Sequence, residues 1–406
     1  MYSTLEKIFQ LKENDTNVRR EVIGGITTFC TMSYIVFVQP AILSIAGMDY
    51  GSVVLATCIS SAIACFLMAF FANYPIALAP GMGENFLFTF TLCLGIGFSW
   101  QSSLAIVFIA GVLFVLLSLF KTREKIIEIF PDCLKNAIPA AIGMLITFVG
   151  LQWAGLIVLN PGTMVSVGSL TKTVPIITII SLLLILFLQS IKFTGAILVG
   201  IFFSSITYLV LGVIPWTKPE LTYSFSTFFK LDFYPLLEKW KEAIPAIFIF
   251  FFLDLFDTVG TLVGVGNAAG LMKEGKLPRA GGAFLADAIS TCIGAVCGTS
   301  TVTSYVESAA GVASGARTGF AALIAGICFI LTIPLVPFLS VLGYDVGPQY
   351  YEQMGMQGTH ISMYPSASPA LIIIGFLMMG SVRRILWDDI SEGLPAFLTI
   401  VFMAFG

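Results

Sequence analysis

Five acidic residues lie within long apolar stretches of the sequence, where a charged side chain is costly. At the centre of a lipid bilayer a charged residue costs at least ~2.5–3.5 kcal/mol, and such residues are retained where they have a function. The stretches around them contain no lysine, arginine or histidine that could neutralise them. Carboxylates in this setting hold protons readily, which is the property that a proton-coupled carrier needs. The five residues are Glu84, Asp254, Asp257, Asp287 and Glu307.

The neighbours of these acids indicate what they could bind. Asp254 and Asp257 are three residues apart and share one face of a helix, with Thr261 one turn beyond Asp257. Glu307 lies in a segment rich in hydroxyl side chains. Carboxylates accept hydrogen bonds and repel anions, and phenylalanines such as Phe86 offer aromatic faces for stacking. The matching ligand is a small, flat, neutral heterocycle rich in N–H donors, such as a nucleobase.

Several of these residues also have a structural interpretation. Asp254 could hydrogen-bond to a neighbouring helix, Asp287 could brace the core, and Glu84 beside Asn85 could face a water-filled vestibule. An intramembrane aspartyl protease would use Asp254 and Asp257, but two aspartates on one helix face cannot readily form a dyad. A channel usually presents rings of like residues in an oligomer, whereas these acids are asymmetric within one chain.

The composition decides which class of protein must position these acids. The chain has 406 residues, of which 57% are hydrophobic and 11% charged, whereas soluble proteins carry about 25% charged residues. A soluble enzyme, a nucleic-acid binder and a disordered protein are therefore excluded, which leaves a polytopic membrane protein. The net charge of −3 identifies no partner, and the eight cysteines lack metal-binding spacing and are interpreted as reduced.

Charged and glycine- or proline-rich breaks divide the apolar sequence into thirteen candidate spans. A polar segment, 1–21, precedes them and is placed in the cytoplasm, because lysine and arginine then gather on the cytoplasmic side. The chain stops within the last span, which leaves no room for a fourteenth. The spans are 22–45, 52–71, 77–96, 101–120, 136–156, 174–190, 194–214, 243–266, 282–297, 298–313, 317–338, 366–381 and 391–406.

An amphipathic connection, 215–242, separates a seven-span half from the rest of the chain. Seven is an odd number, so the second half must enter the membrane upside down relative to the first, which is the topology of an inverted repeat. The third span of each half, 77–96 and 298–313, is interrupted by glycine, proline or β-branched residues. Such a matched pair indicates a transporter's binding site, although glycines that only allow close helix packing are the alternative.

Seven motifs follow one another from residue 24 to the end of the chain. They are GGITTFCTMSYIVFVQPAIL (24–43), APGMGENFLFTF (79–90), FDTVGTLVGV (256–265), ADA (286–288), GTSTVTSYVESAAGV (298–312), RTG (317–319) and WDD with LPAFLT (387–399). Together they make the sequence resemble the AzgA-like purine permeases, a branch of the nucleobase–ascorbate transporter superfamily.

The resemblance implies an all-α polytopic membrane fold of fourteen spans in two inverted repeats of seven, with short β segments in spans 3 and 10. Spans 1–4 and 8–11, here 22–120 and 243–338, would form a core domain that carries the substrate. The remaining spans, here 121–214 and 339–406, would form a gate domain that also dimerises. Span 14 is missing from this count, which would leave the gate incomplete.

The resemblance also implies roles for particular residues. Asp257 matches the acid of span 8, Glu307 matches the acid of span 10, and Thr261 stands where some relatives have a histidine. Asn85 matches the polar residue of span 3, and the backbone around Val306 would face the base.

Two positions depart from the family pattern. Gln39 replaces a common asparagine, and Glu84 stands where many members have an apolar residue. These departures leave open which purine and which coupling ion are used. The hypothesis is a purine:proton symporter that imports adenine, guanine or hypoxanthine by an elevator-type movement of the core. The alternative on the same fold is an anion carrier of the sulfate-permease type, which would be expected to lack acids at its binding point.

The hypothesis describes a multi-pass protein of the plasma or inner membrane, with a cytoplasmic N-terminus and no enzymatic activity. Its partners would be a purine nucleobase, membrane lipid and a second copy of the chain at the gate domain, without nucleic acid. It would need no metal and no cofactor besides a coupling cation, taken as H+. The expected substrate-binding residues are Asp257, Glu307, Thr261, Asn85, Phe86, Val306 and Thr301. The expected proton-coupling residues are Glu307, Asp257, Asp254, Asp287 and Glu84.

Overall fold

The computed structural model describes residues 2–119, 131–160, 162–214, 223–272, 277–342 and 363–405. Parts of the predicted connection (215–222) and of the predicted last gate segment (343–362) lie outside these residues. Within the described residues, nine helices are long and apolar enough to cross a membrane, which confirms the polytopic helical class. They are Val18–Ile45, Tyr50–Phe71, Trp100–Leu119, Cys133–Trp153, Thr173–Ser190, Trp240–Ala268, Ala280–Cys297, Gly319–Leu339 and Pro365–Arg384, and the shorter apolar helices are Met82–Ile96, Ala196–Val210 and Ile390–Met403.

The chain divides into two compact units, each of which combines segments from both halves of the sequence. The first unit contains Met1–Ile127 and Tyr223–Val336, and the second contains Glu128–Thr222 and Pro337–Gly406. All five acids singled out in the sequence fall in the first unit.

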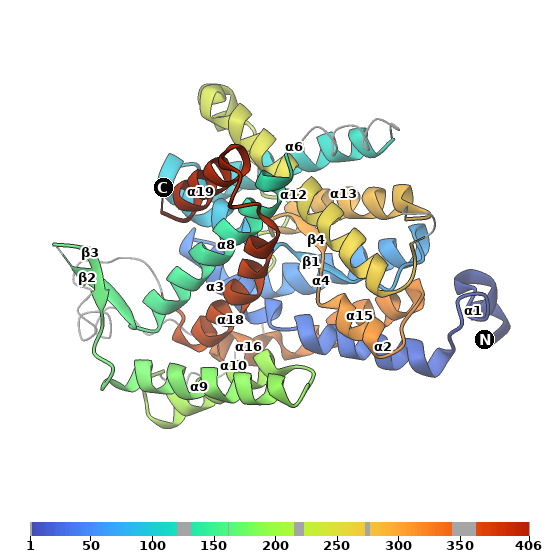
Figure 1. Cartoon of the computed structure of the whole chain (residues 1–406), viewed down its shortest axis with the longest axis horizontal. Coiled ribbons are helices and arrows are strands. Elements are labelled where there is room, and N and C mark those ends of the chain that lie inside the picture. The colour runs from blue at the N-terminus through green and yellow to red at the C-terminus, as the bar shows by residue number, and fades with distance from the viewer. Residues whose placement is uncertain are drawn as a thin grey trace. The chain divides into compact units, whose positions relative to one another are not determined.

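The first unit is a bundle of helices, most of which are apolar. They are α1 (Tyr2–Phe9), α2 (Val18–Met32), α3 (Ile35–Ile45), α4 (Tyr50–Phe71), α6 (Trp100–Leu119), α11 (Tyr234–Glu238), α12 (Trp240–Ala268), α13 (Ala280–Cys297) and α15 (Gly319–Thr332). The helix α13 packs against both α4 and α6, and α15 packs against α4 and α2, which lies beside it in Figure 1. Polar side chains cap the N-termini of some of these helices. At the start of α4, the Asp49 side chain accepts a hydrogen bond from the Ser52 backbone N–H at 2.8 Å.

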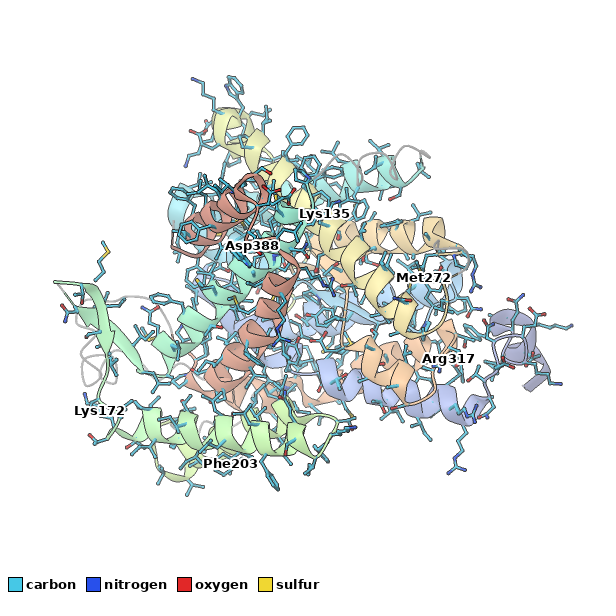
Figure 2. The ribbon with its side chains drawn as sticks, viewed as in Figure 1. Lys135, Lys172, Phe203, Met272, Arg317 and Asp388 are labelled. Carbon is cyan, nitrogen blue, oxygen red and sulfur yellow. The ribbon has the colours of Figure 1, made fainter. Side chains whose placement is uncertain are left out.

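Buried polar groups also hold the start of α15. The Glu21 carboxylate on α2 accepts from the backbone N–H groups of Arg317, Thr318 and Ala321, at 2.8, 3.3 and 3.2 Å. Backbone N–H groups at a helix start lack the usual acceptor one turn earlier, and that of Ala321 is shared with the Thr318 carbonyl oxygen. A carboxylate at a helix N-terminus also complements the helix dipole. Figure 2 labels Arg317 at this junction.

The two interrupted spans of the sequence meet as a pair of short strands. The strand β1 (Leu78–Pro80) precedes α5 (Met82–Phe86) and the π-helical segment η1 (Leu87–Ile96), and β4 (Val302–Ser304) precedes α14 (Ser308–Ala313). The two strands run antiparallel, with Leu78 opposite Ser304 and Pro80 opposite Val302 (Figure 1). Buried extended backbone needs hydrogen-bond partners, and each strand supplies them to the other. The β segments that the resemblance implied in spans 3 and 10 are therefore confirmed.

The second unit contains the remaining apolar helices and a hairpin. Its elements are α8 (Asp132–Trp153), β2 (Ile157–Asn160), β3 (Met164–Val167), α9 (Thr173–Ser190), α10 (Ala196–Val210), η3 (Pro365–Ala367), α18 (Ser368–Met378), η4 (Met379–Arg384) and α19 (Ile390–Phe405); η2 (Ile333–Leu335) and α16 (Val336–Leu342) lie at the boundary of the two units. The helices α8 and α18 cross closely where Gly143 faces Gly375. A Cβ on Gly143 would lie only 2.7 Å from the Gly375 carbonyl oxygen, so the crossing requires a glycine there. The β2–β3 hairpin was not predicted from the sequence.

Candidate functional site

The β1–β4 pair places the acids in one electrostatic cluster. Asp254 and Asp257 come from α12, Asp287 from α13, Glu84 from α5, and Glu307 from the residue before α14. Electrostatic interactions link Asp254 with Asp287, Glu84 with Asp257, and Asp257 with Glu307. Asp254, Asp287 and Glu84 are buried, whereas Asp257 and Glu307 are partly exposed. The two partly exposed acids are accessible to a ligand, and the other three are buried.

Asp287 is held by hydroxyl groups from two other elements. The Thr258 hydroxyl of α12 donates to Asp287 Oδ2 at 2.7 Å, and the Ser304 hydroxyl of β4 donates to Oδ1 at 3.0 Å. Thr258 Oγ1 also lies 3.1 Å from Thr303 Oγ1, on β4. The structural interpretation of Asp287 as a brace thus agrees with its contacts, and its charge also interacts with that of Asp257.

Asp254 has one satisfied and one unsatisfied oxygen. The Thr291 hydroxyl on α13 donates to Asp254 Oδ2 at 2.8 Å, so Asp254 does link two helices. Asp254 Oδ1 is buried and has no hydrogen-bond partner within the described residues.

Glu307 has a partner that the sequence did not indicate. The Tyr34 hydroxyl donates to Glu307 Oε1 at 2.5 Å, across 273 positions of the sequence. Tyr34 lies at the break between α2 and α3, inside the apolar span Val18–Ile45 that corresponds to the first span expected at 22–45. The only hint in the sequence was the polar pair Ser33 and Tyr34 within the motif 24–43. A tyrosine in an apolar span is common, so nothing in the sequence indicated that this one contacts Glu307.

The segment before β4 makes polar contacts with the first and third spans. The Gln39 side-chain amide donates to Thr299 Oγ1 at 2.5 Å, and the Ser300 hydroxyl donates to Asn85 Oδ1. The amide nitrogen of Asn85 and the hydroxyl of Thr301 are buried without a partner in the described residues. Asn85 and Thr301 are therefore both buried, and each has hydrogen-bonding capacity left over.

Glu84 and Phe86 both lie in the buried part of the third span. The Glu84 carboxylate is packed against Gly81, where an added Cβ would contact Glu84 Oε2. Phe86 is fully buried and stacks on Phe90, with ring centroids 5.7 Å apart and planes at 18°. Phe86 therefore supports the site from within and does not present a free face.

Thr261 and Val306 border the partly exposed acids. Thr261 is 8% exposed on α12, and the glycines one residue before it and three after it, Gly260 and Gly264, have open space where a Cβ would lie. Val306 is 61% exposed, next to Glu307. Both α12 and the turn that precedes α14 therefore have exposed positions close in sequence to the two partly exposed acids.

The site offers hydrogen-bond acceptors and backbone to a small ligand. In the part of the chain that the structure describes, no group of three His, Cys, Asp or Glu side chains is arranged to hold a metal ion. Ionised carboxylates accept hydrogen bonds, so Asp257 and Glu307 are suited to a neutral molecule with N–H donors on two edges.

Three comparisons show which known proteins this chain resembles. A family model described as a permease family matches residues 19–347. The guanine/hypoxanthine permease PbuG of Bacillus subtilis (strain 168) is 41% identical over 416 residues, covering 98% of this chain and 89% of PbuG. The adenine permease AdeP of Escherichia coli (strain K12) is 38% identical over 403 residues, covering 99% of this chain and 86% of AdeP.

A solved structure shows the same fold. The transmembrane domain of a cyanobacterium bicarbonate transporter, BicA, has a TM-score of 0.69 at 15% sequence identity. The match covers 96% of this chain and 95% of that domain.

Proposed function

The chain belongs to the permease family whose model matches its residues 19–347, and is a nucleobase transporter and not an enzyme; we propose that it imports purine nucleobases together with protons. One observation carries the proposal. Two partly exposed carboxylates, Asp257 and Glu307, come from different elements beside a pair of strands at which two interrupted spans meet. Purines such as hypoxanthine, adenine and guanine are flat, neutral and carry N–H donors, which carboxylates accept.

We divide the predicted site residues into those that contact the base and those that support the contacting residues. We place Asp257, Glu307 and Thr261 in contact with it, with the backbone at Val306 along its edge. Asn85, Thr301 and Phe86 are buried, and we assign them a supporting role beneath this surface. Gln39, whose side-chain amide holds Thr299, belongs to the same supporting group.

Coupling to protons follows from the cost of moving a carboxylate. An ionised acid without a partner would add several kcal/mol to the passage of the site across the membrane. Protonation of one acid and acceptance of a purine N–H by another reduce this penalty together. We propose that the first unit carries purine and proton past the second unit, in an elevator-type movement.

Anion transport on this fold is the second candidate, because BicA is described as a bicarbonate transporter. The acids at the site oppose it, since they repel an anion. Uptake of purines and competition by anions distinguish a purine carrier from an anion carrier.

Uptake of radiolabelled hypoxanthine, adenine and guanine is measured in a strain that lacks purine transport, with and without an inward proton gradient. Unlabelled purines are expected to compete, and sulfate and bicarbonate are not. Glu307→Gln is expected to lower uptake by about tenfold or more, because a hydrogen bond to a charged group contributes ~1.5–3 kcal/mol. Glu238→Gln, at an exposed position of α11, is the matched control. Wild-type uptake by Glu307→Gln, or competition by anions alone, would contradict the proposal.

The membrane arrangement is part of the same proposal. We place the protein in the cell membrane with its N-terminus in the cytoplasm, and two copies in contact through the second unit. An N-terminal tag should resist protease in right-side-out vesicles and be removed in inverted ones. Light scattering of the purified protein in detergent should give the mass of a dimer, and a monomer mass would argue against the contact.

A further inference from the structure

The pair formed by β1 and β4 has two outer edges, on which backbone groups point away from the partner strand. The Gly81 N–H, directly after β1, donates to the Thr301 carbonyl oxygen at 2.9 Å, so both residues face the other strand. Along an antiparallel strand, successive residues direct their backbone groups to opposite sides. The N–H and C=O groups of Leu78 and Val302 therefore point outward, where a buried polar group needs another partner.

A cysteine of α4 supplies both partners that Leu78 needs. The Leu78 N–H donates to Cys65 Sγ at 3.3 Å, and the Cys65 thiol donates to the Leu78 carbonyl oxygen at 3.4 Å. A thiol is both a weak donor and a weak acceptor, so one side chain can fill both roles. Cys65 and Leu78 are fully buried, so water cannot take the place of the thiol.

A threonine of α13 makes the same two contacts with β4. The Val302 N–H donates to Thr291 Oγ1 at 3.3 Å, and the Thr291 hydroxyl donates to the Val302 carbonyl oxygen at 3.2 Å. Both residues are fully buried, and a Cβ on Gly294 of α13 would lie 2.6 Å from Val302 Cγ2, so the helix lies close against the strand. Thr291 also donates to Asp254 Oδ2 at 2.8 Å, so two acceptors compete for its one proton.

The two side chains occupy corresponding places in the two halves of the chain. The helix α4 precedes β1 and α5, as α13 precedes β4 and α14. Cys65 lies 13 residues before Leu78, and Thr291 lies 11 residues before Val302. Each bonds to both backbone groups of the first residue of its strand. We call these two sets of contacts the edge clamps.

We propose that Cys65 and Thr291 are positioning residues, which fix β1 and β4 and thereby hold Glu307 where it accepts from the purine. The inference rests on the proposed function. The strand β4 leads directly into the turn that carries Glu307, and the Ala77 N–H before β1 donates to the neighbouring Ser308 Oγ at 3.0 Å. A shift of either strand therefore reaches Glu307. Because Cys65 and Thr291 are fully buried, they act through the strands and not by touching the base.

Amide hydrogen exchange of the purified protein tests the first clamp without substrate. Cys65→Ala removes both partners of Leu78, whereas Cys65→Ser keeps a donor and an acceptor. We expect peptides that contain Leu78 to exchange about threefold or more faster in Cys65→Ala, and near the wild-type rate in Cys65→Ser. Cys58→Ala is the matched control, because Cys58 lies on the same helix, is equally buried and takes no part in the bonds to Leu78.

The second clamp is tested in the same way, and it gives an independent result if Cys65→Ala folds poorly. Peptides that contain Val302 should exchange about threefold or more faster in Thr291→Val, and near the wild-type rate in Thr291→Ser. Ser290→Ala is the control, because the buried Ser290 hydroxyl donates to the Ala286 carbonyl oxygen of its own helix at 2.6 Å.

Equilibrium binding of radiolabelled hypoxanthine to the same variants tests the positioning role. We expect the dissociation constant to rise about threefold or more in Cys65→Ala and Thr291→Val, and to stay near the wild-type value in both serine variants and both controls. Side chains that only stabilise the fold would change the unfolding temperature and the yield of folded protein, but the affinity of the folded fraction would not change.

The outcomes separate the clamps from the function beneath them. Wild-type exchange in both Cys65→Ala and Thr291→Val, or equal acceleration in the serine variants, would overturn the clamps. Faster exchange with unchanged affinity would overturn the positioning role. Effects confined to Thr291→Val would assign them to the contact with Asp254 and overturn the equivalence of the two side chains. A wild-type protein that binds no hypoxanthine would refute the proposed function and the positioning role with it, whereas the exchange result would still decide whether the clamps exist.

Discussion

Replacing Tyr34 by phenylalanine removes one hydroxyl from the site, the donor that holds Glu307. Tyr34 is 1% exposed, and its hydroxyl donates to Glu307 Oε1 at 2.5 Å. A hydrogen bond to a charged group contributes ~1.5–3 kcal/mol. Glu307 is partly exposed, so water can take over some of the lost interaction, and the stability loss should lie near the lower end, at about 1.5 kcal/mol.

The effect on purine binding comes from the orientation of Glu307. With Tyr34 in place, the hydrogen bond to Oε1 fixes the Glu307 carboxylate, and under the proposed function Oε2 is the oxygen left to accept from the base. Without the hydroxyl, the Glu307 side chain must be ordered again when the base binds, which costs about 0.5–1.5 kcal/mol. The dissociation constant for hypoxanthine should therefore rise roughly 2- to 13-fold, since 1.4 kcal/mol corresponds to a factor of ten.

Equilibrium binding of radiolabelled hypoxanthine to purified Tyr34→Phe measures this change, and thermal unfolding in the same detergent measures the stability. Tyr208→Phe is the control, because Tyr208 is a fully buried tyrosine of α10 whose hydroxyl lies 3.3 Å from the Val174 carbonyl oxygen. The control should lose stability but bind hypoxanthine as the wild-type protein does. Equal affinities for Tyr34→Phe, Tyr208→Phe and the wild-type protein would show that Tyr34 does not orient Glu307.

Two further predictions concern the packing that supports the site. Gly311→Ala should lower the free energy of unfolding by about 1–3 kcal/mol, because its Cβ would contact Thr28 Oγ1 and lie 2.5 Å from the Gly24 carbonyl oxygen. Gly264→Ala, with no atom within 4 Å of its Cβ, should leave the unfolding temperature unchanged or raise it, and equal losses in the two variants would contradict the steric argument. Glu21→Gln should lower stability by about 1–3 kcal/mol, because one amide oxygen replaces two carboxylate oxygens that accept three backbone N–H groups of α15; unchanged thermal unfolding would refute this role.

The sequence predicts the interrupted spans and their acids because both are local features. A carboxylate in an apolar run is conspicuous wherever the chain goes next, and proline with glycines at 80–83 disfavours a continuous helix. The pairing of β1 with β4 joins segments more than two hundred residues apart, and it was expected from resemblance and not from the residues. The β2–β3 hairpin was missed because its residues, 157–167, were considered only as a connection between spans.

The partners of the acids could not be predicted from sequence, for a physical reason. Thr258 and Thr291 look like ordinary residues of apolar helices, and their hydroxyls could equally have bonded to carbonyl groups of their own helices. Their actual acceptors, Asp287 and Asp254, depend on how α12 and α13 face each other. The same holds for Tyr34, whose contact with Glu307 requires the break between α2 and α3.

Hydroxyl partners suit carboxylates that must change protonation state. A lysine or arginine has donors only, so it favours an ionised acid and opposes its protonation. A threonine, serine or tyrosine hydroxyl donates to an ionised carboxylate and, after rotation of its hydrogen, accepts from a protonated one. Asp254, Asp287 and Glu307 all have hydroxyl partners, so each keeps a hydrogen bond in either state. Each of these three acids can therefore change its protonation state and keep the hydrogen bond to its hydroxyl partner, which is the property that the proposed coupling to protons requires.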